Sequence, residues 1–140
     1  MRHAGQSESP KPIITAYGPP FTPDLPDSFG QDPLQTELTS FTEEGIALVG
    51  GRPIPEWQSL TRPVRARFVS GHLLFTLGTF VEDVPSDPDI YFVGDEITLT
   101  VRAYTHGYDL FHPPEIIVWH AYTRSFRTTH WQDHLPAQGV

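Results

Sequence analysis

Two groups of residues in the last third of the chain have the chemistry of a catalytic or metal-binding site. Asp95 and Glu96 directly follow Gly94, and His120 follows Asp95 by 25 residues. Neighbouring carboxylates can orient a substrate hydroxyl or accept its hydrogen bond, and an imidazole is the commonest side-chain ligand of metal ions. These three residues are therefore the first candidates for a reaction centre.

Each candidate also has an ordinary structural interpretation. Asp95 and Glu96 could be the acidic first turn of a helix, where negative charge complements the helix dipole. His120 could be a structural histidine that is hydrogen-bonded at a sheet edge. The seven histidines include no His-Glu-x-x-His spacing, and the chain has no cysteine, so the sequence contains no zinc motif.

The elements that must position these residues are short and interrupted by proline. Residues 13–17 form a β-branched run that predicts a strand, and the proline-rich residues 18–33 predict an irregular loop. Residues 34–50 predict one or two strands that end at a pair of glycines. Residues 64–68, 73–80, 108–111 and 116–119 are short apolar runs, and His120 ends the last of them.

The segment 95–107 gives two conflicting signals. Ile97, Leu99, Val101 and Ala103 alternate with polar residues, which favours a strand. The acids at its start and Gly107 at its end favour a helix. Periodicity does not decide between them.

Composition and charge restrict the class of protein. With 38% apolar residues, 15 prolines and 11 glycines in 140 residues, the chain has the composition of a globular domain that is rich in turns. The net charge of −8 disfavours nucleic acid as a partner. We find no apolar run long enough to span a membrane and no secretory signal in residues 1–12, so we expect a cytoplasmic protein without a membrane partner. Arg62, Arg65 and Arg67 form the densest basic segment, which suits ordinary ion pairs or a phosphate contact.

A longer pattern around the candidate residues resembles a known family. The pattern is Gly94-Asp95-Glu96, then residues 102–109 (Arg-Ala-Tyr-Thr-His-Gly-Tyr-Asp), then Pro113 and residues 118–124 (Val-Trp-His-Ala-Tyr-Thr-Arg). It is similar to the GlcNAc-transferase family whose members include an enzyme that modifies hydroxyproline. The similarity reaches back through Ser70-Gly71-His72 to residues 13–20 and covers roughly residues 11–134.

The resemblance implies an α/β protein with a GT-A fold, here a mixed sheet with few helices and proline-rich loops. It also implies retaining, metal-dependent transfer of a sugar from a nucleotide sugar to a hydroxyl group on a protein or glycan. A more distant similarity to polypeptide GalNAc-transferases implies roles for single residues. His120 would be a ligand of Mn²⁺ or Mg²⁺, and Asp95 and Glu96 would be catalytic. The substrate-binding residues would be Gly71, His72, Gly94, Tyr122 and Arg124.

Members of that family carry a nucleotide-binding half with an acidic metal motif before the segment that matches residue 13. Residues 1–12 contain no aspartate. We therefore expect the chain to contain a flexible N-terminus (1–10), an acceptor-side half-domain (11–134) and a tail (135–140). Such a half would need a complementary half for activity and metal binding, and it could self-associate.

Two other functions remain open. The chain could be a non-catalytic remnant that binds carbohydrate or peptide in a cleft of aromatic side chains (Tyr104, Tyr108, Phe111, Trp119 and Trp131). It could also be a small metalloprotein of histidines and carboxylates, such as a cupin-like barrel. The lack of a close His-x-His pair weighs against the barrel.

Overall fold

The centre of the fold is a mixed four-stranded sheet, seen in a computed structural model that describes residues 9–90 and 92–123. The strand order is β4 (Val64–Arg65), β6 (Asp109–His112), β1 (Pro12–Thr15) and β5 (Leu74–Phe75). β1 runs parallel to β6, whereas β4 and β5 are antiparallel to their neighbours. All four residues of β1 are buried, which confirms the strand expected from the β-branched run.

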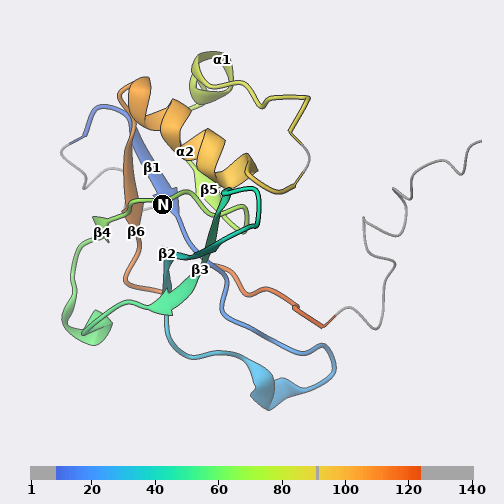
Figure 1. The fold of residues 1–140 in the computed structure, drawn as a ribbon. Coiled ribbons are helices and arrows are strands. Elements are labelled where there is room, and N and C mark those ends of the chain that lie inside the picture. Colours follow the sequence, from blue (N-terminus) through green and yellow to red (C-terminus); the bar gives the residue numbers. More distant parts are fainter. Residues whose placement is uncertain (1–8, 91, 124–140) are drawn as a thin grey trace, which may run out of the picture.

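Helix α2 (Asp95–Thr105) packs on this sheet, and the short helix α1 (Phe80–Asp83) lies above it in Figure 1. The core joins Ile13 of β1 and Leu110 of β6 to Ala103 of α2 and Phe80 of α1. Tyr108 is also fully buried there, and its hydroxyl donates a hydrogen bond of 2.9 Å to Asp83. The structure therefore has the expected architecture of a mixed sheet with few helices.

The conflict over residues 95–107 is resolved in favour of a helix. Gly107 has a φ of +80° and ends the helix, while the amide of Tyr108 donates to the carbonyl of Ala103, as in a Schellman motif. The apparent strand alternation has no structural counterpart, because Val101 is 56% exposed whereas Thr100 and Ala103 are buried. The acidic residues at the start of this segment and Gly107 at its end therefore predict its structure correctly, whereas the apolar alternation does not.

Beside the sheet lies the hairpin of β2 (Leu34–Phe41) and β3 (Ala47–Pro53), seen in the lower half of Figure 1. The sequence predicts the strands but not their end, since β3 continues through Gly50 and Gly51 to Pro53. Gly51 is needed there because a Cβ would come within 2.5 Å of the Tyr17 ring. The proline-rich connections contain only two single turns of 3-10 helix, η2 (Pro26–Ser28) and η3 (Trp57–Ser59).

The strand predicted at residues 116–119 is absent from the structure. Within the described part of the chain, residues 116–119 pair with no strand, and the neighbouring His120 makes one isolated bridge, to Pro20. Pro113 and Pro114 precede the segment and lack the amide hydrogens that a strand ladder requires. Across residues 9–90 and 92–123, no helix is both long and apolar enough to cross a membrane.

His112 joins the hairpin to the sheet. Its side chain is only 1% exposed. The amide of Thr36 donates to Nε2 at 3.1 Å, and Nδ1 lies 2.9 Å from the carbonyl oxygen of Thr15 and donates to it. Burial lowers the pKa of His112, against smaller upward effects of the Thr15 bond and Glu37.

We predict that this buried histidine makes the fold sensitive to acid. Because its pKa is lower in the folded chain than in the unfolded chain, the unfolded chain binds more protons below about pH 6.5. The free energy of unfolding should therefore fall as the pH is lowered from 7.5 to 5.5, as measured by urea denaturation. The fall should be smaller in His112→Gln, and an equal fall in both proteins would contradict this account.

Candidate functional site

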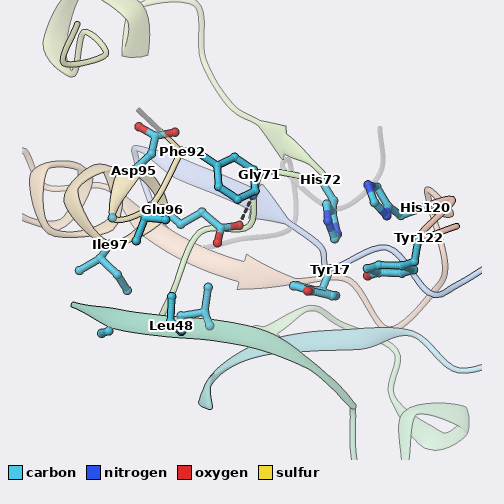
Figure 2. Close-up of a pocket in the computed structure, with 14 residues that line it drawn as sticks. Tyr17, Leu48, Gly71, His72, Phe92, Asp95, Glu96, Ile97, His120 and Tyr122 are labelled. Carbon is cyan, nitrogen blue, oxygen red and sulfur yellow. Dashed lines mark hydrogen bonds between the residues drawn. The ribbon is translucent and has the colours of Figure 1, made fainter. Parts of the chain in front are cut away.

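A cavity of about 530 Å³ lies between the hairpin, the start of α2 and the segments that follow β1 and precede β5. One end is polar and carries the aromatic and histidine rings. The other end is formed by β3 and residues 92–97, whose side chains are apolar except for those of Asp95 and Glu96. Its lining consists of Tyr17, Ala47, Leu48, Val49, Gly71, His72, Phe92, Val93, Gly94, Asp95, Glu96, Ile97, His120 and Tyr122 (Figure 2).

Seven of the eight residues predicted from the sequence line this cavity. They are separated by up to 51 residues along the chain and come from three segments: Gly71 and His72; Gly94, Asp95 and Glu96; and His120 and Tyr122. The eighth, Arg124, lies outside the described residues. The structure thus brings the predicted residues together, while their chemical roles remain predictions.

The turn at residues 69–73 is held by side chains from three places. The amide of Val69 donates to the Thr100 hydroxyl at 2.8 Å, and the amide of Ser70 donates to the Thr15 hydroxyl at 2.8 Å. The next two amides are also bonded: Gly71 donates to the Glu96 carboxylate at 2.6 Å, and His72 donates to Oγ of Ser70 at 3.2 Å. The first three amides therefore fix the turn relative to β1 and α2, and the fourth bonds within the turn.

The two neighbouring carboxylates point in different directions. In Figure 2 the Glu96 side chain reaches toward Gly71, whereas the Asp95 carboxylate points away from the rings. Burial raises the pKa of Glu96, the hydrogen bond from Gly71 lowers it, and the charge of Asp95 raises it again. Glu96 is therefore the carboxylate that faces the polar end of the cavity.

Four rings at the polar end form what we call the ring cluster: Tyr17, His72, His120 and Tyr122. The rings of His72 and His120 are stacked, with centroids 4.3 Å apart and an interplanar angle of 17°. The rings of Tyr17 and His72 form an edge-to-face pair with centroids 4.3 Å apart. The rings of Tyr122 and His120 form another, with centroids 4.4 Å apart. Each ring therefore restricts the orientation of its neighbours.

Gly18 joins three members of the ring cluster. Its amide donates to Nδ1 of His72 at 3.0 Å, and its carbonyl accepts a hydrogen bond of 2.8 Å from the Tyr122 hydroxyl. A Cβ on Gly18 would lie 3.1 Å from Cβ of His120. The absence of a side chain thus allows the His120 segment to pack directly on the chain after β1.

The ring cluster favours uncharged side chains. Burial and the neighbouring His120 lower the pKa of His72 to about 4, so its imidazole is neutral at pH 7. Burial, followed by the influence of Tyr17 and Glu96, raises the pKa of Tyr122 above its ordinary value. His72 and Tyr122 are therefore neutral hydrogen-bonding groups.

A comparison with models of protein families shows the family of the chain. A family model described as "Glycosyltransferase (GlcNAc)" matches residues 1–139. The chain belongs to the GlcNAc glycosyltransferase family. The family implies a sugar donor and an acceptor as substrates, which agrees with the resemblance found in the sequence. No curated protein and no solved structure matches the chain.

The described residues of this glycosyltransferase supply few ligands for the expected divalent ion. Within residues 9–90 and 92–123, no group of three or more histidine or carboxylate side chains is placed to hold a metal together. His120 and the stacked His72 supply imidazoles, but the carboxylate of Asp95 points away from them. The described residues therefore do not form a complete metal site.

Sequence reasoning missed several residues of the site. Tyr17 and Gly18 lie at the end of the first predicted strand, a position that also drew attention to His120. They could have been found by applying the same criterion there. The contribution of β3 through residues 47–49 had no signal in the sequence, because these residues form an ordinary apolar strand.

The other candidates have structural explanations. The aromatic cleft does not form as proposed, since Tyr108 and Phe111 are buried and Tyr104 is 75% exposed; Trp131 lies outside the described residues. Arg65 pairs with Asp109 and lies 5.0 Å from the centre of the Phe111 ring. Arg65 thus acts as an ion-pair partner in the structure.

We predict that Thr100→Val destabilises this glycosyltransferase by about 1–3 kcal/mol, because the buried amide of Val69 loses its acceptor. Urea denaturation measures the change. Thr39→Val is a matched control, since Thr39 is exposed on β2 and its loss should change stability by no more than about 0.5 kcal/mol. Equal effects of the two substitutions would contradict the role assigned to Thr100.

We also predict that Gly18→Ala disturbs the ring cluster and destabilises the protein by about 1–3 kcal/mol, because the new methyl group would crowd His120. The imidazole proton resonances of His72 and His120 should both shift in the NMR spectrum. Gly78→Ala is the control, since a Cβ at Gly78 meets nothing within 4 Å. Unchanged histidine resonances in Gly18→Ala would show that the close packing is unnecessary.

Proposed function

We propose that the cavity is the sugar-transfer site of a retaining glycosyltransferase with a GT-A fold, and that it moves GlcNAc from UDP-GlcNAc to a hydroxyl group of a protein or glycan. The observation that carries the proposal is the convergence of seven predicted site residues on one cavity. Membership of the GlcNAc glycosyltransferase family supplies the reaction class.

The reaction needs positioning more than a strong base. The bond between the anomeric carbon and the diphosphate oxygen breaks, and a bond to the acceptor oxygen forms on the same face of the sugar. The acceptor proton passes to the departing phosphate oxygen, so UDP leaves as the other product. The protein contributes by holding the two substrates close and by stabilising charge.

In this proposal Glu96 is the carboxylate that contacts the sugar or the acceptor hydroxyl. Its backbone bond to Gly71 occupies one oxygen and fixes the side chain, which leaves the second oxygen for a ligand. Asp95 would act at the outer side of the same cavity. The apolar wall of β3 would exclude water from the reacting groups.

A divalent ion remains part of the proposal, with His120 as one ligand. The cavity lining includes the carboxylates of Asp95 and Glu96, and these repel a diphosphate. Mn²⁺ or Mg²⁺ would offset that repulsion and neutralise the leaving group. The remaining ligands, like Arg124 and the nucleotide-binding groups, would come from outside the described residues or from a second polypeptide that complements this one.

The test is titration calorimetry with UDP-GlcNAc, in Mn²⁺ and in EDTA, together with a turnover assay, on the chain by itself and on the chain mixed with a polypeptide that supplies a complementary nucleotide-binding half. Metal-dependent binding and turnover are expected in the complemented sample. We predict binding in Mn²⁺ that is at least tenfold weaker in EDTA and that His120→Ala weakens to the same extent. His106→Ala is the matched control, because His106 is exposed at the far end of α2 and should bind like the wild type.

Two results would change the assignment. Equal binding by His120→Ala and the wild type would remove His120 from the metal site. Saturable binding of a glycan or peptide that needs neither metal nor nucleotide would favour the non-catalytic binding module instead.

A further inference from the structure

The hydrogen bond from Gly18 fixes the tautomer of His72. A neutral imidazole has one nitrogen that carries a proton and one that accepts a hydrogen bond. Nδ1 of His72 accepts the amide hydrogen of Gly18 at 3.0 Å, so Nδ1 has no proton of its own. The ring proton is therefore on Nε2, and His72 presents an N–H donor.

The position of that donor is fixed as well. The ring is stacked on His120 at 4.3 Å and is contacted on another side by Tyr17, also at 4.3 Å. The backbone amide of His72 is bonded to Ser70 within the 69–73 turn. Rotation out of its plane would break the stack on His120, and a 180° flip would replace the Nδ1 acceptor by a carbon and lose the Gly18 bond.

The His72 ring, which carries the Nε2 proton, is part of the cavity wall. His72 lines the cavity wall, and in Figure 2 its ring stands beside that of His120 above Tyr17. Nδ1 faces Gly18, and the N–H of Nε2, which is bonded to the same carbon Cε1, points in a different direction, away from Gly18. Within the described residues, Nε2 donates to no protein atom. A donor with a fixed direction at the wall of a cavity is a means of recognising a ligand oxygen.

We propose that His72 binds an oxygen atom of the transferred sugar through its Nε2 proton and does not ligate the metal. The identity of the ligand rests on the proposed function, whereas the tautomer does not. The hydrogen bond from Gly18 to Nδ1 also explains why we assign Nε2 as a hydrogen-bond donor and not as a metal ligand. Metal binding through Nε2 would require the proton to move to Nδ1, where it would oppose the amide hydrogen of Gly18.

The tautomer can be measured directly by ¹⁵N NMR of the histidine side chains in the full chain. We expect His72 to carry its proton on Nε2 at pH 7, both without metal and after addition of Zn²⁺, a diamagnetic probe for imidazole ligands. A proton on Nδ1, or loss of the Nε2 proton when Zn²⁺ is added, would overturn the proposal.

Two substitutions separate the binding role from the structural role. In His72→Asn the side-chain oxygen can replace Nδ1 as the acceptor for Gly18, but the distal donor is lost. In His72→Gln the side-chain nitrogen can replace the distal donor. We expect His72→Asn to keep the urea midpoint close to that of the wild type and to bind UDP-GlcNAc about three- to tenfold more weakly. His72→Gln should recover part of that loss.

The outcomes distinguish this proposal from the proposed function. Wild-type affinity in His72→Asn would overturn the contact with the sugar. If the wild type itself does not bind UDP-GlcNAc, the proposed function and the sugar contact fail together. The tautomer measurement would then still decide whether His72 is a donor or a metal ligand.

Discussion

The site depends on the hydrogen bonding of one short turn. The four amides of residues 69–72 point toward acceptors on β1, on α2 and within the turn itself. The bonds of the Val69 and Ser70 amides are buried, and a buried amide without an acceptor is costly, so these two bonds favour one position of the turn. Thr15 and Thr100 set that position from the core, and Glu96 sets it from the cavity side. The location of His72 follows from these contacts.

A second set of contacts, at Gly18, places the rings of His120 and Tyr122 next to His72. The chain leaves β1 at Thr15 and passes directly beside the extended segment that carries His120 and Tyr122. This approach is possible because Gly18 has no side chain. The sheet therefore positions His72 through the turn and His120 through Gly18, so that the two imidazoles stack. The proposed transfer reaction, which relies on positioning its two substrates, would benefit from such fixed walls.

Much of this arrangement could be predicted from the sequence, for identifiable reasons. β1 and α2 carry local signals, namely the β-branched run and the acidic start with Gly107 at the end. The candidate residues Gly71, Glu96 and His120 came from the family pattern, and the structure places them around one cavity. The strand expected at residues 116–119 is wrong because their composition suits a strand, whereas pairing depends on distant partners. The wall formed by β3 depends on how the hairpin docks, which is set by His112 and Thr36 far apart in the chain.

The proposed function requires the sugar nucleotide to occupy the cavity between the ring cluster and α2. The most direct measurement is amide NMR of the ¹⁵N-labelled chain as UDP-GlcNAc is added in the presence of Mg²⁺. The account predicts that the largest shifts fall on Gly71, His72, Gly94 and Glu96, with little change at Gly78 and on the far end of α2. Shifts confined to the separate surface around Arg65 and Arg67, or no shifts at all, would contradict it.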